Sequence, residues 1–345
     1  MKHLLLTLDY ELYGDGSGGV FQHIIKPTNR IIEIVESHNA KITIFFEVIE
    51  YWRLKEQWEK GNNMGYANNP IYAIEEQLRI AYKKGHDIQL HLHPQWINAQ
   101  WINGKWIVDN NYWRLSALSE NEIVELFTKG KETIEGIIND SNYHCHAVRA
   151  GGYNIQPSAA IIKAMRKCGL SADCSIYPGG YEQGSLSKYD YRKVPEVLGK
   201  WYCGDTLKEV AQGATDITEL PIVAFPMLRL QKYLSLDRIR AIWRNRNSAS
   251  KSFAAKTVTD GAGKKSKFSK VAYFFRHEAQ TWDFCLFSIS MHRTYLKKIS
   301  RQKERDIFVL VGHPKSFVTG KGMEYLLKHA EKEKYDFPTI SNLQE

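Results

Sequence analysis

Two histidines that alternate along an apolar segment are the first residues of this chain able to do chemistry. The segment runs from Gly85 to Pro94. In an extended strand, side chains at positions i and i+2 project from one face, so His91 and His93 point together. Pro94 disfavours a helix at His93 and places the pair where the strand ends. Two imidazoles on one face are half of a metal site, and the alternative is a pair of structural histidines bonded to backbone carbonyls.

Two carboxylates follow the first apolar segment. Asp9 and Glu11 come directly after residues 3–8 and share one face of an extended chain. If Glu11 joins the two histidines, the set of two imidazoles and one carboxylate suits zinc or another divalent ion that activates a water. Asp9 is then free to act as a base toward that water. The alternative is that both acids cap the following loop.

Two more segments place polar groups after short strands. Arg149 precedes two adjacent glycines, which permit unusual backbone angles and close approach of a ligand, so a backbone N–H near Tyr153 is a candidate oxyanion donor. His313 follows an apolar strand and is a candidate general acid. Taken singly, Arg149 and His313 are more often structural or exposed residues than catalytic ones.

Short apolar segments predict the strands that must carry these groups, at 3–8, 41–46, 87–92, 146–149, 170–174, 217–223, 283–289 and 307–311. Helical patterns lie between them, from Pro27 to Asn39, over 70–84, from the capping box Ser119-x-x-Glu122 to about Ile138, and from Pro157 to Lys167. This alternation predicts an α/β fold with a parallel sheet, as a closed or nearly closed (β/α) barrel with insertions. Active sites in such barrels lie at the C-terminal ends of the strands.

Composition indicates a folded, soluble, cytoplasmic protein. The chain has 345 residues, of which 43% are hydrophobic and 25% charged, close to the globular average. No apolar stretch approaches the roughly 18 to 20 residues that a membrane-spanning helix needs. The apolar run at the start meets Asp9 too early for a signal peptide. The five cysteines form no Cys-x-x-Cys pair, which is typical of reduced thiols in the cytoplasm.

Most of the net charge of +9 falls in one segment, 238–270, which is rich in Lys, Arg, Ser and Gly. This composition is typical of a solvated, mobile insertion. The alternative is an electrostatic arm for an anionic substrate, such as a pyrophosphate- or lipid-linked glycan, or for peripheral contact with a membrane. Sequence-specific nucleic-acid binding is disfavoured, since the sequence has no helix-turn-helix, zinc or RNA-recognition motif.

Taken in order, these segments resemble the polysaccharide deacetylase family, carbohydrate esterase family 4. The matching segments are Thr7 to Glu11, Thr43 to Phe46, Gly85 to His93, Arg149 to Tyr153, Ala172 to Ser175, Glu219 to Pro221 and Val311 to Pro314. Their order makes the joint signal more specific than any one motif. The resemblance implies a single catalytic domain over 1–345 with a distorted, complete or incomplete (β/α) barrel. Insertions interrupt it at about 50–70, 97–115 and 226–280.

The resemblance also implies metal-assisted hydrolysis of an acetamide. Glu11, His91 and His93 would hold the divalent metal, with zinc as the expected ion. Asp9 would act as general base while a metal-activated water attacks the acetamide carbonyl, and His313 would protonate the leaving amine.

Three further residues take roles from the resemblance. Arg149 would pair with Asp9 and favour its ionised form. A backbone N–H near Tyr153 would steady the oxyanion. Asp173 would orient His313 or another part of the active-site floor.

The sequence departs from the family pattern at three positions. Tyr10 stands where the family usually has a second aspartate, so Glu11 is offered as the metal carboxylate. Gln95 stands where the family usually has its second histidine, and His93 is offered instead. Gly152 replaces a common proline. These departures predict a divergent branch and leave a weak-metal or inactive member open.

The implied substrate is an N-acetylated sugar or glycan intermediate of surface-polysaccharide assembly, nucleotide- or lipid-linked. Tryptophans crowd the segment after the histidines, where they would either stack on sugar rings or pack an insertion; they are Trp96, Trp101, Trp106 and Trp113. Two other functions stay open. One is an amidase acting on a small non-sugar amide or cyclic ureide, and the other is a non-catalytic glycan-binding member of the family.

Overall fold

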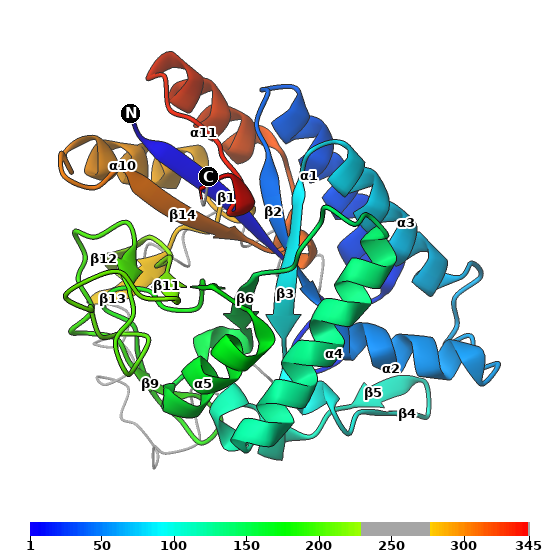
Figure 1. The fold of residues 1–345 in the computed structure, drawn as a ribbon. Helices are drawn as coiled ribbons and strands as arrows, with labels where there is room; N and C mark the ends of the chain where they lie inside the picture. Colours follow the sequence, from blue (N-terminus) through cyan, green and yellow to red (C-terminus); the bar gives the residue numbers. More distant parts are fainter. Residues whose placement is uncertain (229–276, 344–345) are drawn as a thin grey trace, which may run out of the picture.

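Eight strands form the main sheet of the protein, which is known from a computed structural model that describes residues 1–228 and 277–343 (Figure 1). Across the sheet they are β10 (Trp201–Tyr202), β11 (Thr218–Glu219), β7 (Ala172–Asp173), β6 (Ala147–Ala150), β3 (Asp87–Leu92), β2 (Ile42–Glu47), β1 (His3–Tyr10) and β14 (Ile307–Gly312). Neighbours from β11 to β14 are parallel, whereas β10 pairs antiparallel with β11. The predicted parallel sheet is confirmed.

Helices lie around the outside of this curved sheet (Figure 1). They are α1 (Lys26–Glu36), α2 (Val48–Glu59), α3 (Pro70–Lys83), α4 (Glu120–Ile138), α5 (Ala159–Cys168), α10 (Ile289–Ser300) and α11 (Lys321–Lys332). The predicted capping box opens α4: the Ser119 side chain accepts from the N–H of Glu122, and the Glu122 carboxylate accepts from the N–H of Ser119. Because helices cover the parallel strands, these strands are buried on both faces and read as continuous apolar runs.

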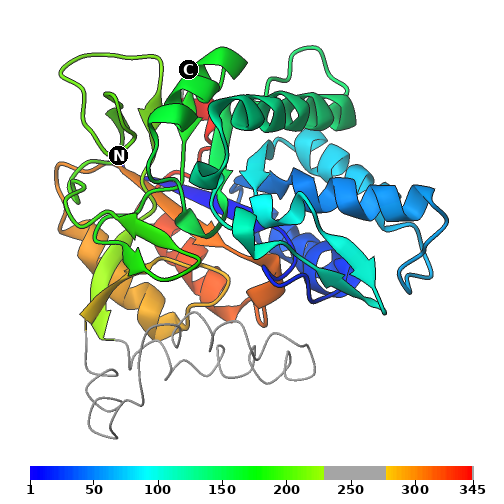
Figure 2. The same cartoon turned by 90° about the horizontal axis from the view of Figure 1, so that it is seen from below.

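Smaller elements lie outside the main sheet. Within the described residues, three two-stranded antiparallel sheets are formed by β4 (Gln100–Ile102) with β5 (Lys105–Ile107), β8 (Tyr181–Gln183) with β9 (Lys188–Asp190), and β12 (Ala224–Leu228) with β13 (His277–Thr281). Short helical segments are η1 (Val20–Ile25), η2 (Pro94–Trp96), η3 (Asn110–Tyr112), η4 (Leu115–Ala117), η5 (Gly151–Tyr153), η7 (Pro314–Ser316) and η8 (Ser341–Leu343). Figure 2 looks onto the end of the molecule at which β3 finishes, where the hairpin of β4 and β5 also lies.

The sheet closes only partly into a barrel. Beyond β11, Ile222 forms an isolated parallel bridge to Val309 of β14, and the N–H of Val223 donates to the Val309 carbonyl. A second isolated bridge joins Asp283 to Val311. Single bridges thus take the place of a continuous strand between β11 and β14. This arrangement confirms the expected distorted (β/α) barrel and shows that it is incomplete.

The strand expected at 283–289 is not formed. The carboxylate of Asp283 accepts from the N–H groups of Cys285 and Leu286, which turns the chain directly after the bridge to Val311. Ser288 then caps the N-terminus of α10. The apolar residues of this segment pack in a turn, so their composition alone misled the strand prediction.

The expected insertions fall on different kinds of structure. Most of 50–70 belongs to α2 and the chain after it, and 97–115 contains β4 and β5. The basic segment 238–270 lies outside the described residues. Within residues 1–228 and 277–343, no helix combines the length and apolar character needed to span a membrane.

Candidate metal centre and active site

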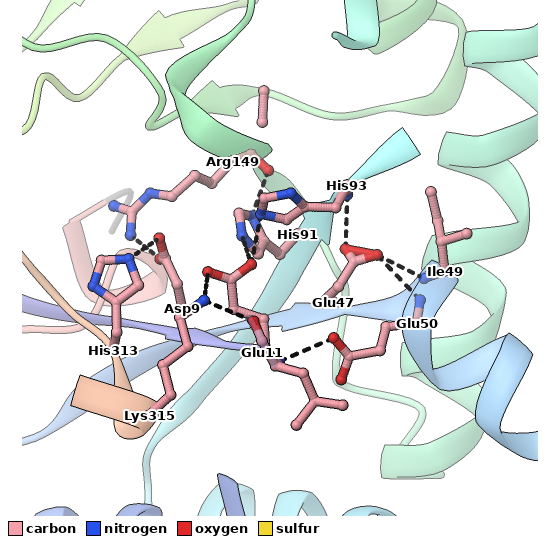
Figure 3. A network of polar contacts seen from close by, with 12 residues as sticks. Asp9, Glu11, Glu47, Ile49, Glu50, His91, His93, Arg149, His313 and Lys315 are labelled. Carbon is pink, nitrogen blue, oxygen red and sulfur yellow. Dashed lines mark hydrogen bonds and ion pairs between the residues drawn. The ribbon is translucent and has the colours of Figure 1, made fainter. Parts of the chain in front are cut away.

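The parallel register gathers the candidate residues at one edge of the sheet. Asp9 lies near the end of β1, and Glu11 follows that strand. His91 is opposite Arg149 on the neighbouring β6, and His93 directly follows β3. Parallel strands finish at a common edge, so residues that are distant in sequence converge there. Figure 3 shows these side chains pointing toward one another.

Glu11, His91 and His93 form a buried cluster. Glu11 is 5% exposed, His91 1% and His93 7%. The Oε2 atom of Glu11 lies 2.5 Å from His93 Nε2 and 3.3 Å from His91 Nε2. The ligand atoms of these residues all lie within 4.8 Å of one another, a spacing that one metal ion can bridge. Two imidazoles and one carboxylate form a donor set suited to zinc or a similar divalent ion.

The orientation of His91 fits a metal ligand. Its Nδ1 lies 2.8 Å from the carbonyl oxygen of Arg149, and because a carbonyl only accepts, Nδ1 must carry the ring hydrogen. The lone pair of Nε2 therefore faces Glu11. This Nε2 is buried and has no hydrogen-bond partner. Buried polar atoms are rarely left unpaired, so the orphaned nitrogen supports a bound cation here.

Lys315 holds the other oxygen of Glu11. Its Nζ lies 2.6 Å from Oε1 of Glu11 and 2.7 Å from the carbonyl of Leu12. Burial opposes ionisation of Glu11, but His93, Lys315 and His91 outweigh it and hold the pKa of the carboxyl well below its usual value. Glu11 is thus a carboxylate whose Oε2 is left facing the two histidines.

Asp9 and Arg149 form a buried ion pair. Arg149 Nη1 lies 2.5 Å from Oδ1 of Asp9, and Arg149 is fully buried. The guanidinium is fixed further by the carbonyl of Cys174, which accepts from Nε at 2.8 Å. Burial opposes ionisation of Asp9, but Arg149 and the nearby histidines outweigh it and lower the pKa of the carboxyl. The structure thus brings Arg149 to Asp9 as the sequence predicts.

His313 bridges two carboxylates. Its Nε2 lies 3.5 Å from Oδ2 of Asp9, and its Nδ1 lies 3.1 Å from Oδ2 of Asp283. Burial disfavours the imidazolium, but Asp283 and Asp9 outweigh it and raise the pKa of His313 above its usual value. A histidine whose pKa is raised retains its proton to higher pH and is suited to act as an acid.

Asp173 does not contact His313, whose partner is Asp283. The carboxylate of Asp173 accepts from the N–H of Ser175 at 2.9 Å and from the Ser175 hydroxyl at 2.8 Å. The Ser175 hydroxyl oxygen in turn accepts from the N–H of Ala150, at the end of β6. Of the two roles expected for Asp173, the structure therefore supports contact with the floor under β6. The physical reason is position, since the isolated bridge from Asp283 to Val311 places Asp283 beside the end of β14, which His313 directly follows.

The chain around Tyr153 adopts the unusual backbone angles that the glycines predict. Gly152 and Tyr153 both have positive φ angles, of 57° and 63°. A non-glycine residue in this region stores strain and is a recognised feature of functional sites. Gly151 has a separate role, because a Cβ there would lie 2.5 Å from the ring of His93. This loop therefore makes room for the imidazole.

Two buried glutamates support the cluster from β2 and α2. Glu47 accepts from the N–H of His93 at 2.8 Å and also caps the first turn of α2. Glu50 accepts from the N–H of Leu12 at 2.9 Å. Burial raises the pKa of Glu47 well above its usual value and that of Glu50 to about 8. These groups fix the backbone next to His93 and Glu11.

Sequence reasoning gave no role to Lys315, Asp283 or Glu47. Lys315 lies in η7, two residues after His313, where the alternation of a strand does not apply, so no local pattern placed it at the site. Asp283 comes from a turn that reaches the site through an isolated bridge, which no local pattern reveals.

Three of the four tryptophans after the histidines pack against one another, whereas the indole N–H of Trp113 donates to the Ser187 hydroxyl. Trp96 and Trp106 are buried with ring centroids 5.3 Å apart, and Trp101 contacts Trp106 at 5.4 Å. These edge-to-face contacts favour the packing alternative over an exposed sugar-stacking platform.

Comparisons with known proteins place the fold. No family model matches the sequence, and no curated protein matches it. Among solved structures, a protein described as a polysaccharide deacetylase from Mycobacterium smegmatis is 13% identical, with a TM-score of 0.50 over 99% of this chain and 89% of that one. The polysaccharide deacetylase Bc1974 from Bacillus cereus is 12% identical, with a TM-score of 0.41 over 99% and 92% of the two chains. A pseudoenzyme of the same family from Bacillus anthracis is 10% identical, with a TM-score of 0.40 over 100% and 66%.

At these identities the similarity shows the fold, and the Mycobacterium smegmatis structure carries that conclusion. The curved sheet, its partial closure and the motif order expected from the resemblance agree with it. This chain has the fold of the polysaccharide deacetylases.

Proposed function

We propose that this protein is a divergent polysaccharide deacetylase that removes an N-acetyl group from a sugar, using a divalent metal held by Glu11, His91 and His93. The observation that carries this proposal is the Nε2 of His91, which is buried, faces Glu11 and has no hydrogen-bond partner. Beside this cluster lie the carboxylate of Asp9 and the imidazole of His313, which face each other. A metal-ligating cluster next to a candidate base and acid is the equipment of metal-assisted amide hydrolysis.

Each side of the site has a distinct task. A divalent ion bound there would lower the pKa of a water toward about 7 and polarise the acetamide carbonyl. Asp9, kept ionised by Arg149, accepts the proton of the attacking water. His313, kept protonated by Asp283 and Asp9, gives its proton to the nitrogen of the leaving amine.

The loop at Tyr153 completes the proposed site. The backbone N–H in this strained segment would donate to the oxygen that becomes negative during attack. The Arg149 side chain stays in its ion pair throughout, because it is fully buried and bonded to Cys174 as well as to Asp9.

The substrate assignment rests on the sequence. We propose an N-acetylated precursor of a surface polysaccharide, linked to a nucleotide or a lipid, handled in the cytoplasm. The concentration of positive charge in 238–270 supports an anionic carrier or peripheral contact with an anionic membrane. Zinc is the proposed ion.

Metal content tests the proposal first. Purified wild-type protein, His91→Ala and His93→Ala are analysed by inductively coupled plasma mass spectrometry after incubation with zinc and gel filtration. About one equivalent of zinc in the wild type and its loss in both variants support the site. A wild-type protein that binds no metal would contradict it and favour a non-catalytic glycan-binding member.

Turnover then separates the remaining functions. Release of acetate from acetylated sugar nucleotides or lipid-linked sugars supports the deacetylase, whereas hydrolysis of hydantoin-like rings alone supports the amidase alternative. Asp9→Asn is the matched variant: it is expected to abolish turnover while retaining zinc. If Asp9→Asn loses zinc as well, the roles of Asp9 and Glu11 have been assigned wrongly.

A further inference from the structure

The side-chain amide of Gln95 contacts the proposed metal ligand His93 at Nδ1, the ring nitrogen that does not face Glu11. Gln95 lies in η2 and is fully buried, and its backbone carbonyl accepts from the N–H of Asp109 at 2.9 Å. Its amide nitrogen lies 2.9 Å from Nδ1 of His93. The amide oxygen is also buried but has no hydrogen-bond partner. An unsatisfied buried acceptor is destabilising, so this amide is incompletely hydrogen-bonded.

The direction of this hydrogen bond decides whether His93 can bind a metal. An amide nitrogen donates, so Nδ1 of His93 accepts and the ring hydrogen is on Nε2. That hydrogen faces Oε2 of Glu11, which accepts it at 2.5 Å. In this tautomer Nε2 has no lone pair to offer. His93 is therefore arranged as a donor to Glu11.

His91 differs from His93 in this respect. The Nδ1 of His91 faces the backbone carbonyl of Arg149, which accepts whether or not a metal is present. His91 is therefore fixed with its Nε2 lone pair toward the cluster. His93 instead contacts a side-chain amide, and an amide can present either a donor or an acceptor.

A half-turn of the Gln95 amide would convert His93 into a ligand. The rotation exchanges nitrogen and oxygen with almost no change of shape. As the ring changes tautomer, Nε2 releases its hydrogen to solvent and Nδ1 takes one up from solvent, so the number of protons on the ring is unchanged. The amide oxygen would then accept from Nδ1–H of His93, and the lone pair of Nε2 would join Glu11 and His91 as a ligand. Histidine ligands commonly donate their other ring N–H to such an acceptor, which fixes their orientation.

We propose that Gln95 is a positioning residue for His93 whose amide turns over when a divalent cation binds and thereby fixes His93 as a ligand. The inference rests on the proposed metal site and adds to it a residue outside the proposed ligand set.

Two substitutions with opposite expectations test the inference. Gln95→Met keeps the length of the side chain but offers His93 no acceptor, so we expect zinc affinity to fall roughly 10- to 100-fold. Gln95→Glu offers a permanent acceptor, so we expect affinity at least equal to that of the wild type. The full-length protein is titrated with zinc in competition with a chromophoric chelator, which measures the dissociation constant without reference to activity.

Gln89→Met is the matched control. Gln89 is another fully buried glutamine, on β3, and its amide contacts Asp87 rather than a metal ligand. Because the Gln89 amide contacts none of the proposed ligands, its substitution is expected to leave zinc affinity within about twofold of the wild type. Thermal unfolding in the presence of chelator verifies that each variant is folded.

The outcomes separate this inference from the proposed function. Wild-type affinity in Gln95→Met, or an equal loss in Gln95→Met and Gln95→Glu, would overturn the role of Gln95 while leaving the metal site intact. A wild-type protein that binds no zinc would overturn both.

The wild-type protein provides a second measurement, which applies even if Gln95→Met does not fold. Long-range ¹H–¹⁵N correlation spectra of the His93 imidazole report which nitrogen carries the hydrogen. We expect the hydrogen on Nε2 without zinc and on Nδ1 with zinc. An unchanged position would overturn the inference.

Discussion

Two buried carboxylates at opposite ends of the sheet are held in contrasting ways. Within residues 1–228 and 277–343, the hydrogen-bond donors to Asp87, at the start of β3, are neutral: the Gln89 amide, the Thr43 hydroxyl, and both the hydroxyl and the N–H of Ser341. Glu11, beyond the end of β1, is bonded by the Lys315 ammonium and faces two imidazoles, one of which has an unpartnered nitrogen. Both acids are about 5% exposed.

The difference indicates that the two ends of the sheet have different roles. Neutral hydrogen bonds saturate the oxygens of Asp87 and tie the C-terminal segment to the sheet, which is a stabilising arrangement. The Glu11 cluster concentrates charge and leaves a nitrogen unsatisfied, which costs stability unless a ligand completes it. We therefore expect substitutions at the Asp87 end to affect folding and those at the Glu11 end to affect metal binding.

Glu11→Gln is expected to have the largest effect. Neutralising this carboxylate removes the anionic ligand, so we expect zinc affinity to fall by more than about 100-fold, beyond the cost of losing an outer contact. Turnover should be lost with it. Chelator competition and acetate release measure the two effects. Full zinc binding by this variant would mean that Glu11 is not a ligand.

Asp87→Asn makes the same chemical change at the other end. One carboxylate oxygen becomes an amide donor that faces other donors, so we expect a loss of about 1 to 3 kcal/mol in the free energy of unfolding. Zinc content per folded molecule should not change. Chemical denaturation and metal analysis test this pair of expectations, and loss of zinc from the folded variant would break the contrast between the ends.

Asp283→Asn sharpens the description of the active-site end. The proposed acid His313 must be protonated, so the rate falls as pH rises through its pKa. Asp283 helps raise that pKa, and its neutralisation should shift the alkaline fall in kcat to lower pH. We also expect a roughly tenfold lower kcat at neutral pH. A pH–rate profile identical to that of the wild type would exclude Asp283 as the partner that sets the proton on His313.

Glu50→Gln is expected to have the smallest effect, on stability alone. Burial raises the pKa of Glu50 from 4.5 to about 8, so the folded state retains a proton that the unfolded state releases above about pH 4.5. The free energy of unfolding of the wild type therefore falls relative to that of the Glu50→Gln variant as pH rises from about 4.5 to 8. Melting temperatures should be similar near pH 4 and differ by roughly a few degrees above pH 8, with Gln higher. A constant difference across this range would contradict the raised pKa.

Local patterns predicted the parts of the fold that depend on near neighbours. The strands at 3–8 and 87–92, the helix over 70–84 and the cap at Ser119 all follow from short-range periodicity and capping chemistry. The strand expected at 283–289 failed, because the side chain of Asp283 bonds to its own following backbone and turns the chain.

The candidate site likewise has features that local sequence patterns predict and features that depend on tertiary contacts. The sequence determined which side chains share a face, since His91 with His93 and Asp9 with Glu11 depend only on the two-residue repeat of a strand. The tertiary structure decided which faces meet. It brought Lys315 to Glu11, and it gave His313 to Asp283 instead of Asp173.

The tertiary structure also decided which group contacts Nδ1 of each imidazole: the carbonyl of Arg149 for His91 and the amide of Gln95 for His93. The physical reason is that hydrogen bonds and ion pairs act over a few ångströms in space, while the residues that make them are separated by up to hundreds of positions along the chain.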